Sequence, residues 1–482
     1  MGNYDLTWPA LTLVVGGVAW FVGTGFRRGA FLSPYSLILL ILLSVFGFRP
    51  LLMPAEPVSF DFYGHDISNG YRLATIIGFV GTLSFIAGYA TRRLMAREGS
   101  PELDRPLLPR VTPGRAALAA WALLALWLGV MIVAGGGPGF LAVLFAGRSD
   151  AANTVFAGLP AIVPALPVVS CLMAATVRFK TERIRRYRPH ENMAYWIIAV
   201  VAIIPPSALG TRRFIIPSVL IMIVGALARS WDRKVRPTWL IAGIAGFLIL
   251  AIVPFVRSAG SRVGGRTDLL GAMSVYFRDE GARGTLDNFF LSYDTEMFNW
   301  VAYFAPRLGE TIPYGMGRGT AGEVLSMSIP AAVSPFERWN DTLLTYAFGA
   351  GCGAGTVCPV PSIVGVLHSD LSWVGLTFGM AILGVLCANY EGRLMASRGS
   401  YTALLLLATG FSILFARGNS MAQVWIAVQV FVAWWIVYII VSTLAAPRAQ
   451  GGSTALPRSV PVNTSVSRPL SRHAGSSGND GQ

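Results

Sequence analysis

The sequence predicts an all-α, polytopic integral membrane protein. Of its 482 residues, 54% are hydrophobic and 13% are charged, and the mean hydropathy is +0.58. Soluble domains carry about 25% charged residues, so a soluble globular fold is excluded. The apolar residues also fall in runs of about 17–26 residues without Asp, Glu, Lys or Arg, and such runs are long enough to cross a hydrocarbon core as helices.

Eleven apolar runs are predicted as transmembrane helices, within a range of 10–12. The pair 194–209 and 214–228 is ambiguous, because both runs are short and only four residues separate them. They form either two crossings or one re-entrant hairpin, and both arrangements return the chain to the same side. The runs are 8–26, 31–48, 73–90, 116–135, 155–177, 194–209, 214–228, 238–256, 371–390, 400–416 and 421–446.

The basic residues predict how the chain is oriented in the membrane. Alternate connections between the runs hold 24 of the 38 Lys and Arg residues, and the positive-inside rule makes that side cytoplasmic. The N-terminus is then outside and the C-terminus inside. The net charge of +14 divides into +16 inside (24 basic less 8 acidic) and −2 outside (14 basic less 16 acidic). The basicity is therefore an orientation signal, and no nucleic-acid partner is predicted.

The connections divide the chain into four segments. Residues 1–256 hold the first eight helices and residues 371–446 the last three. Between them, 257–370 form a large extracytoplasmic loop of about 114 residues, whose many aromatic residues favour order over disorder. Residues 447–482 are rich in Ser, Gly, Pro and Asn and predict a disordered cytoplasmic tail.

Two motifs in the predicted outer loop could indicate a nucleotide site or a disulfide. The segment Gly317–Gly322 matches G-x-G-x-x-G, but no strand pattern precedes it, so we expect a glycine-rich turn without a dinucleotide. Cys352 and Cys358 lie on the side where disulfides persist, and either form a disulfide or remain two thiols. The four Cys and four His residues are too dispersed for a metal site, and we expect no metal or cofactor.

Arginines at the predicted outer ends of helices are candidates for phosphate binding. Arg212 and Arg213 lie in a tight outer turn, and Arg417 follows the run 400–416. A guanidinium can chelate phosphate with two parallel hydrogen bonds, although such residues also snorkel to lipid headgroups. The outer loop adds further arginines that would suit a pyrophosphate or an acidic glycan, namely Arg257, Arg262, Arg266 and Arg278.

Few residues offer acid–base chemistry on the outer side. His368 is followed two residues later by Asp370, and this pair either acts as a base at the membrane surface or packs structurally. Asp341 in the outer loop is a further candidate carboxylate. The apolar runs themselves carry no Asp, Glu, Lys or Arg, which argues against an ion-coupled transporter.

Three segments together resemble the Wzy-type oligosaccharide repeat-unit polymerases, a family related to the O-antigen ligases. They are Leu209-Gly210-Thr211-Arg212-Arg213 before an apolar helix; Tyr314-Gly315, Ile329-Pro330, Pro335, Pro361-Ser362 and Gly365 leading to Trp373-Val374-Gly375; and Arg417-Gly418 between the last two helices. The many-helix topology with one large late outer loop is also similar. The chain departs from the family at Val366, where an acidic residue is common, and at His368, where an aromatic residue is common.

The resemblance implies an inverting, metal-independent glycosyl transfer on the outer face of the bacterial cytoplasmic membrane. A growing glycan on undecaprenyl pyrophosphate would move to a sugar hydroxyl of the next lipid-linked repeat unit, which makes a cell-surface polysaccharide or exopolysaccharide. Arg212, Arg213 and Arg417 would hold the pyrophosphate, and His368, Asp370 or Asp341 would act as the base. Membrane lipid, a chain-length regulator and a flippase are the further expected partners.

Two alternatives remain at this stage. One is another lipid-sugar enzyme, either a ligase or a polyprenyl-phosphate-dependent glycosyltransferase. The latter class places acidic residues in its first outer loop, where this chain has Glu56, Asp61 and Asp66. The other is a flippase or transporter of lipid-linked sugar, which the absence of charges within the helices disfavours.

Overall fold

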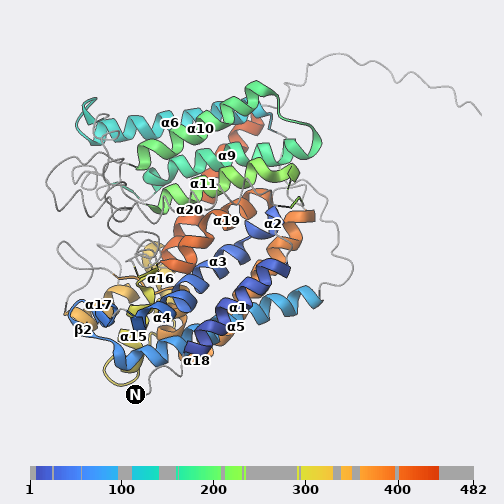
Figure 1. The fold of residues 1–482 in the computed structure, drawn as a ribbon. Helices are drawn as coiled ribbons and strands as arrows, with labels where there is room; N and C mark the ends of the chain where they lie inside the picture. The colour runs from blue at the N-terminus through green and yellow to red at the C-terminus, as the bar shows by residue number, and fades with distance from the viewer. Residues whose placement is uncertain are drawn as a thin grey trace, which may run out of the picture. The chain divides into compact units, whose positions relative to one another are not determined.

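Helices make up most of the described part of the chain (Figure 1). Among the described residues, six helices are long and apolar enough to cross a membrane, and three shorter apolar helices accompany them. The computed structural model describes residues 7–23, 27–55, 57–95, 111–140, 159–160, 162–207, 212–230, 233–234, 290–291, 295–328, 338–349, 359–396, 401–418 and 420–444.

The described helices follow the apolar runs of the sequence. Each predicted run except 238–256, which lies outside the described residues, coincides with a helix, so an all-α fold with membrane-spanning helices is confirmed. The tail 447–482 also lies outside the described residues. The longer helices are α1 (Thr7–Gly23), α3 (Pro34–Leu42), α5 (Ser68–Met95), α6 (Pro113–Ala134), α9 (Ile162–Ile184), α10 (Pro189–Ser207), α11 (Arg212–Leu227), α18 (Ile363–Ala396), α19 (Tyr401–Arg417) and α20 (Ser420–Thr443).

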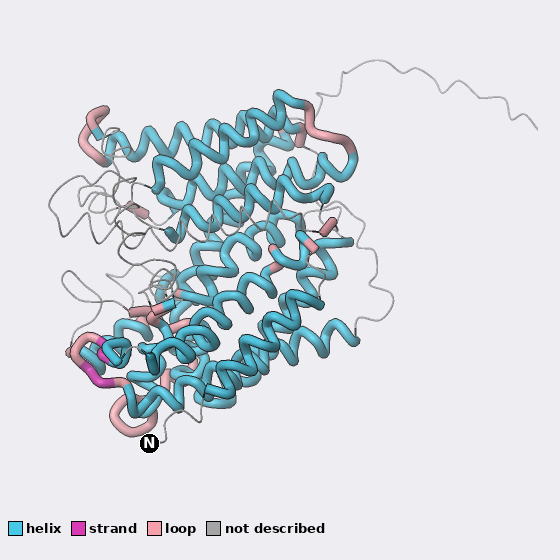
Figure 2. Tube along the Cα trace, viewed as in Figure 1, coloured by secondary structure: helices cyan, strands magenta, loops and turns pink. Residues whose placement is uncertain are grey.

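Short elements of the predicted outer loop and of the first outer connection gather near one end of the helices (Figure 2). The two-residue strands β1 (Asp61–Phe62) and β2 (His65–Asp66) pair as a hairpin, which is a small departure from a purely helical prediction. The short helices are α2 (Arg28–Phe31), α4 (Arg49–Leu52), α15 (Met297–Phe304), α16 (Glu323–Ser328) and α17 (Trp339–Phe348), with π-helical turns at Leu43–Phe48 and Arg318–Gly322.

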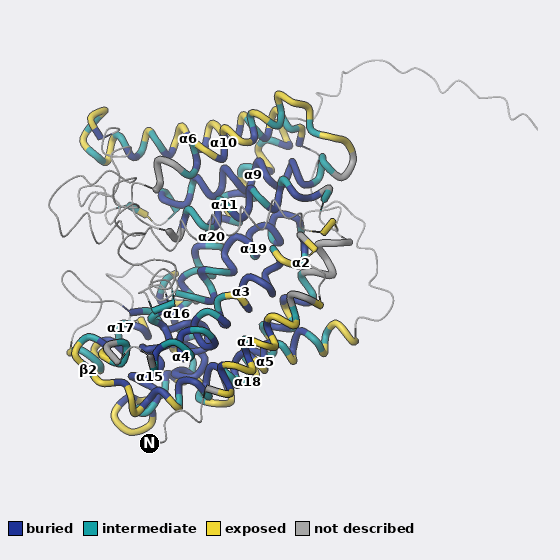
Figure 3. Tube along the Cα trace, viewed as in Figure 1, coloured by how far each residue is buried: buried dark blue, intermediate teal, exposed yellow. Residues whose placement is uncertain are grey.

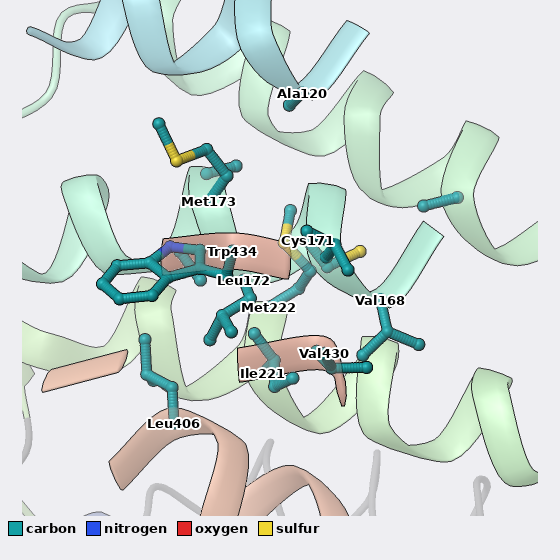
Figure 4. Close-up of a cluster of buried hydrophobic side chains, with 14 of the residues drawn as sticks. Ala120, Val168, Cys171, Leu172, Met173, Ile221, Met222, Leu406, Val430 and Trp434 are labelled. Atoms are coloured by element: carbon teal, nitrogen blue, oxygen red, sulfur yellow. The ribbon is translucent and has the colours of Figure 1, made fainter. Parts of the chain in front are cut away.

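The buried side chains form two apolar cores (Figure 3). The first core joins α6, α9, α10, α11, α19 and α20, with α9 at its centre. Its large side chains, such as Trp434, interdigitate with the unbranched and β-branched residues of α9 and α11. Figure 4 shows Ala120 of α6, Val168, Cys171, Leu172 and Met173 of α9, Ile221 and Met222 of α11, Leu406 of α19, and Val430 and Trp434 of α20.

The second core joins α1, α3, α5, α15, α17 and α18. Its main contact is between α5 and α18, whose backbones approach closely at two glycines. A Cβ atom at Gly88 would collide with the carbonyl oxygen of Ala381, and one at Gly384 would collide with that of Phe85. Helix α15 is buried along its whole length in this core, so a segment of the predicted outer loop is part of the folded body.

Helix α18 begins inside the predicted loop and is broken near its start. Leu371 and Ser372 have non-helical dihedral angles, and Ser372 has a positive φ of 56°. The bend is sharp, because a Cβ atom at Gly375 would lie 2.8 Å from the carbonyl oxygen of Leu367, and one at Gly379 would lie 2.8 Å from the Leu367 side chain. Residues 363–370 therefore fold against the longer segment 373–396.

We expect Gly384→Ala to lower the melting temperature of the purified protein, because the new methyl group meets backbone atoms that cannot move aside. The cost is about 1–3 kcal/mol, typical of overpacking. Gly129→Ala on α6 is the matched control, since nothing lies within 4 Å of its Cβ position. Thermal unfolding in detergent should leave this control unchanged or slightly stabilised. Equal melting temperatures for the two variants would contradict the close α5–α18 packing.

Candidate functional site

Three contacts establish which helix ends lie together. The Tyr195 hydroxyl near the start of α10 donates a 2.6 Å hydrogen bond to the carbonyl oxygen of Met222 in the second half of α11. The Arg178 guanidinium of α9 lies 4.2 Å from the centre of the Tyr195 ring, and the Lys180 ammonium lies 5.5 Å from the ring of Tyr438 in α20. The end of α11 and the end of α20 are therefore at the same end of the bundle.

The start of α11 and the turn between α19 and α20 must then lie at the opposite end. Helices α11 and α19 contact each other, and a Cβ atom at Gly410 would lie 3.2 Å from the carbonyl oxygen of Pro217. Arg212 lies five residues before Pro217 and Arg417 seven after Gly410, which is about 8 and 10 Å along the helix axes. The structure thus brings the two arginine-bearing helix ends together.

The side chains of Arg212 and Arg213 lie outside the described residues, whereas Arg417 is half-buried at the end of α19. Helix α11 starts at Arg212, so its N-terminal N–H groups add a positive field at this position. The predicted site residues Arg257, Arg262, Arg266, Arg278, Cys352 and Cys358 also lie outside the described residues.

An apolar cavity of about 300 Å³ lies between α3, α18, α19 and α20. Two of its lining residues, Leu386 and Val428, are 48% and 44% exposed, so the cavity opens on the apolar surface of the bundle. Phe415 and Gln423 place one end of it within a few residues of Arg417. The lining residues are Pro34, Ile38, Leu383, Leu386, Cys387, Tyr390, Leu404, Leu407, Ala408, Phe411, Ser412, Phe415, Gln423, Val424, Ala427, Val428 and Phe431.

Asp370, a predicted base, is fully buried at the break of α18. One carboxylate oxygen accepts hydrogen bonds from the backbone N–H groups of Gly317 (2.7 Å) and Gly319 (3.1 Å), and the other accepts one from the Thr320 hydroxyl (2.7 Å). The backbone N–H of Met316 also donates to the Asp370 carbonyl oxygen at 2.8 Å. We call this set of contacts the Asp370 clasp, and its geometry is that of a structural anchor.

The clasp explains the glycine-rich motif. Gly317 has a φ of 96°, which glycine adopts without strain, and a Cβ atom at Gly319 would meet the Trp339 ring. The motif forms a π-helical turn rather than a strand-to-helix junction, as the prediction of a glycine-rich turn requires. Its inward N–H groups, which bind phosphate in a dinucleotide fold, are here occupied by the protein's own carboxylate.

The other predicted bases lie near the clasp but differ in exposure. His368 is 2% exposed, and its ring packs edge-on against Trp373 with centroids 5.0 Å apart. Its Nδ1 atom is buried and has no hydrogen-bond partner among the described residues. Asp341 is half-buried in the first turn of α17, next to Trp339, whose indole N–H donates to Ser369 at 3.0 Å. The structure thus brings the three predicted bases into one region of the fold.

A buried arginine, Arg49, is the centre of a hydrogen-bonded cluster that was not predicted from the sequence. Arg49 is 3% exposed and begins α4, directly after a π-helical turn. Its Nε donates to Asn299 Oδ1 (3.0 Å), and its Nη1 donates to Thr295 Oγ1 (2.7 Å). Next to Thr295, Glu296 accepts a 2.9 Å hydrogen bond from the Tyr63 hydroxyl. Arg49 could have been found from the sequence, because it follows an uncharged run at the predicted outer side, as Arg417 does. No pattern in the sequence around Glu296 distinguishes it from other acidic residues.

Comparison of the chain with models of known families, with curated proteins and with solved structures finds no match.

We expect Asp370→Ala to destabilise the protein by at least about 1–3 kcal/mol, because it leaves the N–H groups of Gly317 and Gly319 without their acceptor at a buried position. Thr320→Val removes one hydrogen bond and should cost about 0.5–1.5 kcal/mol. Thr345→Val, exposed on α17, is the control. Unfolding free energies and limited proteolysis near Gly317 measure both effects. Wild-type stability and proteolysis in Asp370→Ala would refute the clasp.

Proposed function

We propose that this protein is a membrane glycosyltransferase that polymerises undecaprenyl-pyrophosphate-linked oligosaccharide repeat units on the outer face of the bacterial cytoplasmic membrane. The observation that carries the proposal is the apolar cavity whose lining reaches Phe415, two residues before Arg417 at the end of α19. A lipid-linked sugar has the matching chemistry, since it joins a long apolar chain to a doubly charged pyrophosphate and then to a polar glycan.

Each part of such a substrate has a counterpart in the fold. The cavity suits a polyprenyl chain, because its lining is almost wholly apolar and it opens toward lipid. The ends of α19 and α11 suit the pyrophosphate, because fixed cations and a helix N-terminus stabilise the negative charge that develops on a leaving group. The short helices α16 and α17 carry exposed residues, such as Leu325 and Tyr346, and so provide surface for the glycan.

The same chemistry serves a ligase, which differs only in the acceptor of the glycan. A flippase needs a polar path through the bundle, whereas the described cavity is apolar apart from a few side chains such as Ser412 and Gln423. The geometry therefore supports glycosyl transfer at one end of the bundle over transport across it.

Removing an arginine should abolish polymer growth without unfolding the protein. In proteoliposomes supplied with the lipid-linked repeat unit and no ion gradient, the wild type should produce a ladder of polymer lengths. Arg417→Ala and Arg212→Ala should each reduce its rate by about 10²–10³-fold, the usual loss when one donor to a developing anion is removed. Arg186→Ala, exposed at the opposite end of the bundle, is the control. Normal polymer from Arg417→Ala would reject the role of that residue.

Filling the cavity should weaken binding of the lipid carrier. Ala427→Trp places a large ring among the lining residues, whereas Val432→Trp places the same ring on α20 at a position that is 50% exposed. We expect the first variant alone to raise the KM for lipid-linked donor, measured from initial rates at several donor concentrations. Identical KM values for the two variants would show that the lipid chain binds elsewhere.

A further inference from the structure

Glu296 presents a carboxylate oxygen that no described residue occupies. It precedes α15, whose residues Met297–Phe304 are all buried, yet Glu296 itself is half-exposed. Its Oε2 accepts the hydrogen bond from Tyr63, while its Oε1 accepts none within the described part of the chain. The carboxylate is thus fixed in position by one oxygen and presents the other.

The groups behind Glu296 hold it rigidly. Arg49 interacts with its charge, and the hydrogen bonds from Arg49 to Thr295 and Asn299 fix the residues on either side of Glu296. Tyr63 and Gly64 are the two central residues of the turn between β1 and β2, and their positive φ values of 53° and 82° are those that a tight two-residue hairpin turn uses. The hairpin therefore holds the Tyr63 hydroxyl in place against the carboxylate.

Aromatic rings border the same carboxylate. Tyr63 packs edge-on against Phe348 with centroids 6.1 Å apart, and His65 packs against Tyr303 at 5.1 Å and Phe348 at 5.7 Å. Tyr63, His65 and Phe348 are each only partly buried. Partly exposed rings beside a carboxylate and a phenolic hydroxyl suit a sugar, whose hydroxyl groups need polar partners and whose ring faces are apolar.

We infer that Glu296 is the general base that accepts the proton of the acceptor sugar hydroxyl, in a glycan subsite formed with Tyr63, His65 and Phe348. This inference rests on the proposed polymerase function. The acceptor O–H proton moves to Glu296 Oε1, and the hydroxyl oxygen forms a bond to C1 of the donor sugar. The bond between C1 and the pyrophosphate oxygen breaks, and undecaprenyl pyrophosphate leaves with the electron pair.

The other predicted bases are less suited to this step. Both carboxylate oxygens of Asp370 already accept hydrogen bonds in the clasp, and the His368 ring is buried. Asp341 keeps an accessible carboxylate but has no fixed hydrogen-bond donor among the described residues. Compared with Asp370 and Asp341, Glu296 combines a hydrogen bond that orients one carboxylate oxygen with a second oxygen that no described residue occupies.

The environment also shifts the pKa of the Glu296 carboxyl in the direction that suits a base. Burial raises the pKa of Glu296 above its ordinary value, and the hydrogen bond from Tyr63 and the charge of Arg49 oppose this shift without reversing it. Tyr63 and Arg49 are the titratable groups that face the carboxylate. Because the base must be deprotonated, the rate should rise with pH through this raised pKa.

The test uses the full-length protein in nanodiscs with lipid-linked repeat units as donor and acceptor. Glu296→Gln should reduce elongation by about 10²–10⁴-fold and remove the acidic limb of the pH profile. Glu310→Gln is the matched control, because Glu310 is exposed and lies in the same predicted outer loop. If Glu296→Gln elongates as fast as Glu310→Gln while the wild type is active, the inference is overturned and the polymerase function stands.

A second variant tests the role of Glu296 without removing its carboxylate. Tyr63→Phe deletes the hydrogen bond that lowers the carboxylate pKa, so the acidic limb should move to higher pH in folded protein. An unmoved limb in Tyr63→Phe, or a loss of elongation in Asp341→Asn with none in Glu296→Gln, would assign the base elsewhere. A wild type that extends no lipid-linked repeat under any condition would instead overturn the polymerase function itself.

Discussion

The fold depends on the hydrogen bonds that the buried carboxylate of Asp370 accepts. Asp370 lies at the C-terminal end of a short helical segment, where the helix dipole disfavours negative charge, and it is removed from water. Three donors from residues about fifty positions earlier compensate for both penalties. The clasp therefore joins the outer segment to the break in α18, and this fixes where α16 and α17 lie beside the membrane helices.

Charge placement links the fold to the proposed chemistry. A bilayer core offers no partners to polar groups, so the described cavity between α3, α18, α19 and α20 is lined by apolar side chains and suits only an apolar chain. Cations are instead placed at helix ends, as at Arg417, or buried with hydrogen-bond acceptors, as at Arg49. This separation of an apolar cavity from charged helix ends matches a substrate that has one apolar part and one charged part.

Sequence patterns predicted much of this arrangement but not its catalytic details. Uncharged runs mark the helices because burial in lipid requires them, and arginine at run ends pointed to Arg417. Local sequence carried no sign that the Gly317–Gly322 turn would enclose Asp370, because that contact joins residues far apart in the chain. Local sequence also could not show that both carboxylate oxygens of Asp370 accept hydrogen bonds, whereas one oxygen of Glu296 accepts none from the described residues.

Composition and periodicity alone determined that the chain is a bundle of membrane helices with long polar connections. Hydrophobic length and charge segregation are one-dimensional properties, so the sequence contains them in full. Only the tertiary structure decided which helix ends meet, that α11 and α19 bring their arginine ends together, and which carboxylates are consumed by internal hydrogen bonds. These are properties of contacts between distant residues, and no local pattern encodes them.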